Sequence, residues 1–161
     1  MTSVQNDEVR VELTVDAPIE MAFKVFTEGI DTWWPRGHYL GSGEMVEKVL
    51  EPRVGGKLYG READGTRCSS GTVLVWDPPK HVAFSWEISL EWQAQSDPEM
   101  ASRVDVTFAA EGPNRTAVTL VHSGFERHGT GWESMRDGVS GEGGWSDMVD
   151  SYAKAAEAAA A

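Results

Sequence analysis

Two histidines stand where a histidine could do chemistry. His122 shares its parity with Val118 and Leu120 on an alternating segment, so we expect its ring to point to the inner face of a strand. His38 follows a Trp-Trp-Pro turn in a glycine-rich segment. Either imidazole could exchange a proton near neutral pH or hydrogen-bond a ligand. The alternatives are a neutral core histidine bonded to a backbone carbonyl or to Ser123, and a polar group at position 38 that fixes the loop.

Cys68 is the single cysteine of the chain, so an internal disulfide is excluded. A nucleophilic cysteine needs a nearby base and a lowered pKa, whereas a lone cysteine on a strand is more often a small buried apolar residue. A metal site would need a third ligand beside the two histidines, and Cys68 and Glu44 stand at no recognisable metal spacing. No glycine-rich phosphate loop leads from a strand into a helix. We therefore expect no metal and no cofactor.

Aromatic side chains are the other candidates, because the chain has seven tryptophans. Flat indoles could line a pocket for a planar ligand and offer an N–H donor, and the alternative for any one of them is plain core packing. Besides the two histidines, the candidate ligand-binding residues are Trp34, Trp86, Trp92, Phe108, Tyr59 and Met148.

Alternating apolar residues predict strands that would position these side chains. Residues 8–15 alternate cleanly, and Pro18 then opens a helix with an apolar stripe from Ile19 to Phe26. A second short helix is expected at about 28–34. Further strands are predicted at 46–50, 57–62, 67–76, 81–88, about 104–108 and about 118–122, with a long connection over 90–101.

The last part of the chain, about residues 131–160, is predicted to be helical. Trp145, Met148, Val149 and Tyr152 recur at helical spacing and form one apolar face. The glycines from Gly138 to Gly144 are poor helix formers and put the continuity of this helix in doubt. They could form a hinge that gates a cavity.

The order of the elements predicts an α+β fold in one domain, residues 1–161, with its core at about 8–155. Strands this closely spaced pair antiparallel, because parallel pairing needs long crossovers. We expect a curved sheet of six or seven strands around one long C-terminal helix, with two short helices after the first strand. Such a helix covers the concave face of the sheet and often leaves a cavity there.

Several motifs make the chain resemble a known family. They are Ala17-Pro18, Trp33-Trp34-Pro35 with His38, Leu50–Gly56, Asp64-Gly65, Gly71-Thr72-Val73, Trp76–Pro79, Phe84-Ser85-Trp86 and His122–Phe125. With these the chain resembles the AHSA homologue-like family, named for its similarity to activators of the heat-shock chaperone ATPase, in the START/SRPBCC superfamily. The resemblance implies the helix-grip fold and a hydrophobic cavity, and it implies no reaction.

Composition excludes several kinds of partner. The formal net charge is −12, which repels phosphate backbones and anionic lipid surfaces, so we expect neither nucleic-acid binding nor membrane insertion. No run of 18 apolar residues and no secretory leader stands in the sequence, so a cytoplasmic location is expected.

The leading hypothesis is the binding of a small hydrophobic or amphipathic ligand between the sheet and the C-terminal helix. One alternative is a cyclase- or hydrolase-type enzyme that uses the same cavity, with His122 as its general base. Another is a chaperone ATPase regulator or partner-protein binding module, and a homodimer is a further alternative. The sequence leaves open whether any reaction is catalysed.

Overall fold

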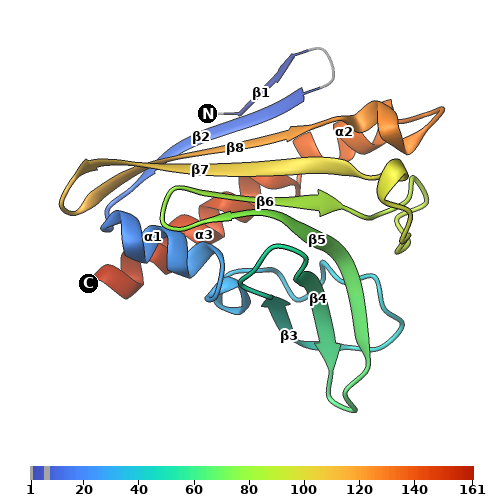
Figure 1. Cartoon of the computed structure of the whole chain (residues 1–161), viewed down its shortest axis with the longest axis horizontal. Coiled ribbons are helices and arrows are strands. Elements are labelled where there is room, and N and C mark those ends of the chain that lie inside the picture. Colours follow the sequence, from blue (N-terminus) through green and yellow to red (C-terminus); the bar gives the residue numbers. More distant parts are fainter. Residues whose placement is uncertain (1, 6–7) are drawn as a thin grey trace.

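A curved antiparallel sheet forms the frame of the molecule in the computed structural model, which describes residues 2–5 and 8–161 (Figure 1). Every pair of neighbouring strands runs antiparallel, as the short connections predict. In sheet order the strands are β1 (Thr2–Gln5), β2 (Glu8–Val15), β8 (Arg115–Ser123), β7 (Ser102–Gly112), β6 (His81–Trp86), β5 (Arg67–Asp77), β4 (Lys57–Glu62) and β3 (Met45–Leu50).

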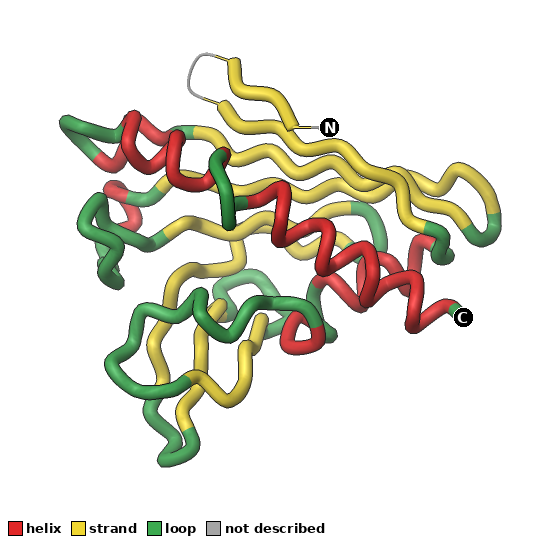
Figure 2. The backbone as a smooth tube through the Cα atoms, turned by 180° about the vertical axis from the view of Figure 1, so that it is seen from behind, coloured by secondary structure: helices red, strands yellow, loops and turns green. Residues whose placement is uncertain are grey.

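The helices gather on one side of this sheet, and the long C-terminal helix runs across it (Figure 2). This helix also packs against the first one, where the Tyr152 hydroxyl donates to the carbonyl of Ala22 at 2.7 Å. The helices are α1 (Ile19–Phe26), α2 (Glu133–Ser140) and α3 (Trp145–Ala160), and the short 3-10 turns are η1 (Ile30–Thr32), η2 (Pro98–Met100) and η3 (Phe125–His128). The predicted helix-grip fold is confirmed.

The strands lie where alternation predicts them. In β2, for example, Val9 and Val11 are buried while Arg10 and Glu12 are exposed. The seven strands β2 to β8 match the predicted segments, although β6 ends at Trp86 rather than at Ile88. An eighth strand, β1, pairs with β2 at the sheet edge, and the sequence analysis did not include it.

The sheet bends sharply along β5, so that β3, β4 and the first half of β5 turn away from the other strands (Figure 1). The register between neighbouring strands shifts at this bend, once between β4 and β5 and once between β5 and β6. Gly71 stands there because a Cβ at this position would lie 2.4 Å from the carbonyl oxygen of Ser85. α3 begins near this bend, where the ring of its first residue, Trp145, lies 5.3 Å from the ring of Trp86 in β6.

The predicted C-terminal helix is two helices, which confirms the doubt about its continuity. The chain between α2 and α3 turns at Gly143, whose φ of +77° favours glycine. A Cβ at Gly144 would lie 2.1 Å from the carbonyl oxygen of Val139, so the backbone there approaches too closely for any other residue. We call residues 141–144 the glycine break.

Candidate functional site

A cavity of about 400 Å³ lies between the glycine break, the loop after η1 and the inner faces of β3, β5 and β6. This volume lies within the range of small-molecule sites, which runs from about 300 to 1,000 Å³. Its wall is rich in indole rings, because four of the seven tryptophans line it. Residues of this wall include Trp34, Lys48, Ser70, Trp86, Trp145 and Met148.

Five of the eight candidate residues from the sequence line this cavity. Trp34 contributes from the segment after η1, Trp86 from β6 and Met148 from α3. His38 and Trp92 lie at the rim, where both are exposed. The binding role of these five residues stays a prediction. Trp86 and Met148 reach the cavity as the alternation and the helical spacing indicate, whereas His38 and Trp92 come from loops.

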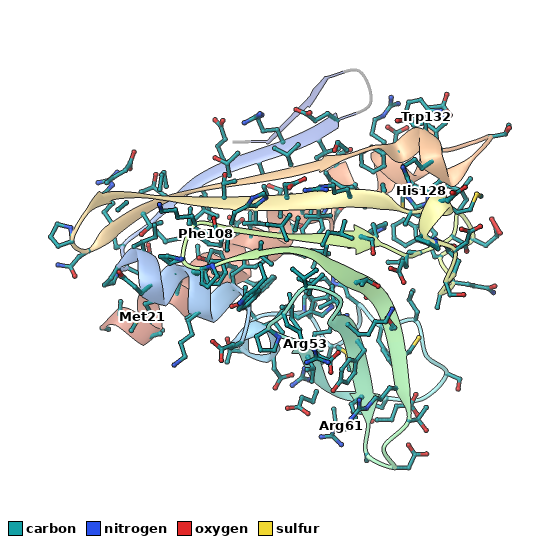
Figure 3. The ribbon with its side chains drawn as sticks, viewed as in Figure 1. Met21, Arg53, Arg61, Phe108, His128 and Trp132 are labelled. Atoms are coloured by element: carbon teal, nitrogen blue, oxygen red, sulfur yellow. The ribbon has the colours of Figure 1, made fainter. Side chains whose placement is uncertain are left out.

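Phe108 and Tyr59 lie elsewhere. Phe108 packs in the core above α1, with ring centroids 5.3 Å from Phe23 and 6.0 Å from Phe26 (Figure 3). Tyr59 is buried in β4, and the guanidinium of Arg67 lies 4.6 Å from its ring centroid. Parity places Phe108 on the inner face, in a part of it that packs against α1 and not at the cavity. Tyr59 pairs with Val49 and Ser69, so it lies on the face of β4 opposite the cavity.

His122 is a core residue rather than part of the cavity wall, with no exposed surface. The indole N–H of Trp145 donates to its Nδ1 at 3.0 Å, and its Nε2 lies 2.7 Å from Oγ of Ser102. Because an indole can only donate, Nδ1 is the acceptor and Nε2 carries the proton of the neutral ring. The alternative of a neutral core histidine therefore describes the geometry, with Trp145 and Ser102 as partners instead of Ser123.

A second histidine completes this buried chain of hydrogen bonds. Oγ of Ser102 lies 2.7 Å from Nε2 of His128, and the ring of His128 also bonds to the backbone of Ile88. Burial lowers the pKa of both His122 and His128, so both rings are neutral at pH 7. All four nitrogens are engaged, which suits a structural role and gives no support to His122 as a general base.

Lys48 is the cavity residue that the sequence analysis missed. It comes from β3, only 4% of its surface is exposed, and it lies in the cavity wall. Its Nζ lies 4.4 Å from the ring centroid of Trp34 and 3.3 Å from Oγ of Ser70. Burial lowers the pKa of this amine to about 7. Lys48 shares its parity with Leu50, which is buried, and this alternation was the signal in the sequence that it faces inward. The register shift between Met45 and Glu47 interrupts the alternation at the start of the strand.

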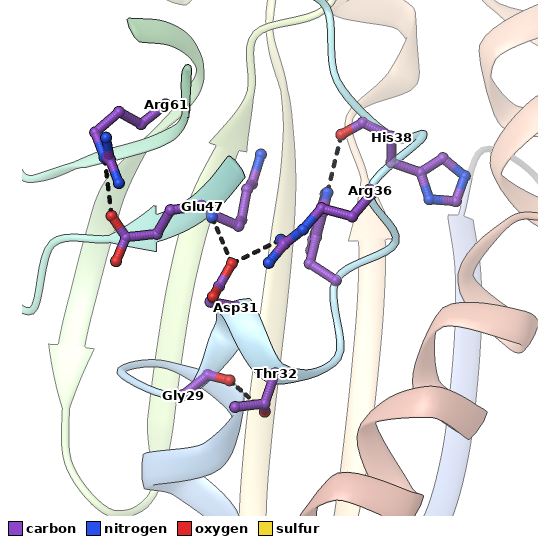
Figure 4. Close-up of polar contacts among 9 residues, drawn as sticks. Gly29, Asp31, Thr32, Arg36, His38, Glu47 and Arg61 are labelled. Atoms are coloured by element: carbon purple, nitrogen blue, oxygen red, sulfur yellow. Dashed lines mark hydrogen bonds and ion pairs between the residues drawn. The ribbon is translucent and has the colours of Figure 1, made fainter. Parts of the chain in front are cut away.

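Asp31 fixes the backbone of this lysine. Its Oδ1 accepts from Nη1 of Arg36 at 2.7 Å and from the backbone N–H of Lys48 at 2.8 Å (Figure 4). Although burial favours the neutral acid, these hydrogen bonds and the nearby guanidinium hold the pKa of Asp31 below its usual value. The carboxylate thereby links η1 to β3 and to residues 33–44 between them, which we call the rim loop. Nζ of Lys48 does not take part in this link and lies near Ser70 and Trp34.

His38 joins the rim loop to the glycine break. Its carbonyl accepts the indole N–H of Trp34 at 3.0 Å (Figure 4), and its ring bonds to the backbone of Gly143. Desolvation lowers the pKa of His38, and the bond to Gly143 offsets this only in part. The imidazole is therefore neutral at pH 7 and closes one side of the cavity mouth.

Trp92 covers another side of the mouth. It has a φ of +59°, the one positive φ of a non-glycine residue in the described part of the chain. Its ring packs on Gly138 of α2, where a Cβ would lie 2.7 Å from the indole. The glycine within α2 is thus explained by the close approach of an aromatic ring.

The remaining polar groups of the wall are mostly neutral. Burial raises the pKa of the Cys68 thiol, and the nearby Lys48 amine offsets this only in part, so the group is not an activated nucleophile. The indole N–H of Trp86 has no hydrogen-bond partner among the residues that the structure describes. Within those residues no three His, Cys, Asp or Glu side chains are grouped as a metal site requires.

The fold and this cavity define an α+β protein of the helix-grip class. The chain belongs to the family described as "Activator of Hsp90 ATPase homolog 1-like protein", which matches residues 16–157. A search of curated proteins found no significant match. No helix in the described part of the chain has the length and apolar character needed to cross a membrane.

Solved structures resemble the chain over nearly its whole length. The anthrahydroquino-γ-pyrone synthase Txn09, described as complexed with SUM, is 35% identical, with a TM-score of 0.64 over 92% of this chain and 96% of that one. The self-sacrificing resistance protein CalC from Micromonospora echinospora is 27% identical, with a TM-score of 0.67 over 96% and 97%. A protein from Nitrosomonas europaea shares the fold at 12% identity, with a TM-score of 0.65 over 95% and 96%.

Proposed function

We propose that the protein binds a small planar hydrophobic ligand in the cavity between the sheet and α3. The observation that carries this proposal is the wall of four tryptophans around a space of about 400 Å³. Indole faces offer large apolar surfaces that suit flat rings. The relative Txn09, described as complexed with SUM, supports a ligand in this fold at 35% identity.

A fluorescence titration tests this proposal with 2-methoxyanthraquinone, a planar neutral probe. We expect saturable quenching of the tryptophan emission with one probe molecule per chain. The variant Ser70→Leu adds a larger side chain to the wall, and it should weaken binding by about tenfold or more, which is about 1.4 kcal/mol. The matched control Ser134→Leu changes an exposed serine of α2 and should bind like the unchanged protein. Equal affinity in all three proteins would place the probe outside the cavity and contradict the proposal.

A second candidate function is an enzyme of cyclase or synthase type that acts on such a ligand. One observation favours it, namely the identity of 35% with a protein described as a synthase. His122 does not serve as its base in this proposal, because that ring is buried and engaged. Incubation of the protein with a hydroxyaryl ketone that can cyclise, followed by mass spectrometry, would detect a product of altered mass or retention.

A partner-protein function rests on the family description alone. Among the residues whose exposure the structure describes, five large apolar side chains are exposed, and no observation joins them into one docking surface. They are Val46, Val54, Leu74, Trp92 and Met100. Binding to a chaperone, formation of a homodimer and a cytoplasmic location stay predictions.

A further inference from the structure

We propose that Lys48 and Trp86 select the ligand of this cavity, a planar compound with two oxygens. One is an acidic phenol or enol hydroxyl that gives its proton to Nζ of Lys48, and the other is a carbonyl oxygen that accepts from the indole N–H of Trp86. This inference rests on the proposed function and names its ligand class.

The first step is the missing counter-charge of Lys48. A buried ammonium is costly unless an anion pairs with it. Among the residues that the structure describes, no carboxylate forms an ion pair with Nζ, and the one polar side chain within hydrogen-bond distance of it is the neutral hydroxyl of Ser70, at 3.3 Å. The face of Trp34 offers a favourable but weaker contact. An anionic group of a ligand would therefore supply the counter-charge that the protonated amine lacks.

The second step concerns the other titratable groups around Lys48. In the rim loop, desolvation lowers the pKa of His38, while burial and the bond to Glu62 raise the pKa of Tyr39. Burial raises the pKa of Cys68 in β5. All three are therefore uncharged at pH 7. The carboxylate of Asp31 in η1 accepts hydrogen bonds from Arg36 and from the backbone N–H of Lys48. Glu142 of the glycine break lies in the wall but is exposed.

The third step is a second donor without a partner. Trp86 is 5% exposed and lines the cavity, and its indole N–H is unpaired among the described residues. A buried donor without an acceptor costs about 1–3 kcal/mol, so its presence in a cavity wall points to an acceptor that the ligand supplies. A carbonyl oxygen fits this role. Two donors in one apolar wall thus match a ligand with two oxygens.

The proton transfer needs no further reactant. The O–H bond of the ligand breaks, its proton joins the lone pair of the neutral amine, and the products are an ammonium and an oxyanion in contact. Each charge then has its counter-charge, which favours the pair in a site removed from water. The ligand enters as the neutral acid, so the exposed carboxylate of Glu142 does not repel it.

Two matched probes test this inference, 2-hydroxyanthraquinone and 2-methoxyanthraquinone. The phenolate of the first absorbs at longer wavelength than the phenol, so a pH titration of the bound probe reports its ionisation. We expect the apparent pKa of the bound hydroxy probe to fall by about one unit or more below that of the free probe. In Lys48→Met the fall should disappear, and affinity for the hydroxy probe at pH 7 should drop about tenfold, while affinity for the methoxy probe is kept.

Two further variants separate the buried charge of Lys48 from other changes. Lys48→Arg keeps a positive charge and should restore the bound phenolate, whereas Lys80→Met removes an exposed ammonium outside the cavity and should leave the spectrum as in the unchanged protein. If the bound hydroxy probe has the same pKa in the unchanged protein and in Lys48→Met, or if the shift is also lost in Lys80→Met, the inference is overturned. If neither probe binds the unchanged protein, the proposed function fails, and the inference fails with it.

Discussion

Lys48 shows how one residue can serve a site at the expense of stability. Its amine has a pKa of about 7 in the folded protein, against 10.5 for an ordinary lysine. Between these values the unfolded chain binds more protons than the folded one, so acidification from pH 10.5 toward pH 7 lowers the free energy of unfolding. Active and binding sites commonly carry such a cost.

Lys48→Met should therefore stabilise the protein at pH 7. Removal of the buried amine is expected to raise the free energy of unfolding by on the order of 2 kcal/mol, and Tm rises by about 2–4 °C for each kcal/mol. The gain should shrink as the pH rises and should be lost above about 10.5, where the amine is neutral in both states. Thermal unfolding followed by circular dichroism checks this, with exposed Lys80→Met as the control. A lower Tm for Lys48→Met at pH 7 would contradict the account.

His122 should make stability depend on pH in the acidic direction. Burial lowers its folded-state pKa well below 6.5, so below pH 6.5 the unfolded state binds more protons and the free energy of unfolding falls. Each such histidine contributes up to about 1.4 kcal/mol per pH unit, and His128 acts in the same direction.

Urea unfolding at pH 7.5 and pH 5.5 checks this contribution. His122→Gln removes one titrating ring and should lose less stability between the two pH values than the unchanged protein does, although it is less stable at pH 7.5. Equal losses in the two proteins would show that His122 does not titrate on unfolding.

The candidate residues could be predicted from the sequence only in part. Trp34 was a candidate for its aromatic ring alone, whereas Trp86 and Met148 line the cavity as parity and helical spacing indicate, because these report which face of an element is inside. The same signal also chose His122, since it cannot tell the cavity part of an inner face from the packed part. Lys48 was missed because a lysine on a strand is normally exposed.

At the scale of elements, the glycine break decides where α3 starts. α2 ends at Ser140 and α3 begins at Trp145, and between them the chain turns at Gly143 and passes close to the carbonyl of Val139 at Gly144. The indole of Trp145, the first residue of α3, then reaches both the cavity wall and the buried ring of His122. The break therefore positions one wall of the cavity.

Gly144→Ala should disturb this arrangement. Its Cβ would lie 2.1 Å from the carbonyl oxygen of Val139, so the backbone must shift, and we expect a loss of about 2 kcal/mol or more. Gly37→Ala is the matched control, because a Cβ at Gly37 meets nothing within 4 Å and should change stability by less than about 0.5 kcal/mol. Chemical unfolding of both variants checks this. Equal stability of the two would contradict the proposed role of the break.

The element pattern was the most predictable part of the structure. Alternation in β2 and β8 and the apolar stripe of α1 are local signals, and they were sufficient. The bend of the sheet at β5 was not predicted, because it depends on register shifts between neighbouring strands that one segment does not reveal. The break between α2 and α3 was anticipated, since its glycines are visible in the sequence.

At the scale of the whole molecule, the chain has the helix-grip fold and belongs to its matching family, and we propose a class of ligand for its cavity. The sheet angle, α3 and the rim loop converge on one apolar space. Among the described residues, its wall contains an amine that pairs with no carboxylate and a tryptophan whose buried indole N–H has no acceptor. A protein with a net charge of −12 would attract few anions from solution, so a neutral acid that ionises inside suits it.

A crystal structure of the protein with 2-hydroxyanthraquinone tests the central claim most directly. We expect the three rings to lie between Trp34, Trp86 and Trp145, with the ionised oxygen within hydrogen-bond distance of Nζ of Lys48. A probe bound outside this cavity, or bound inside it with its hydroxyl turned away from Lys48, would contradict the account.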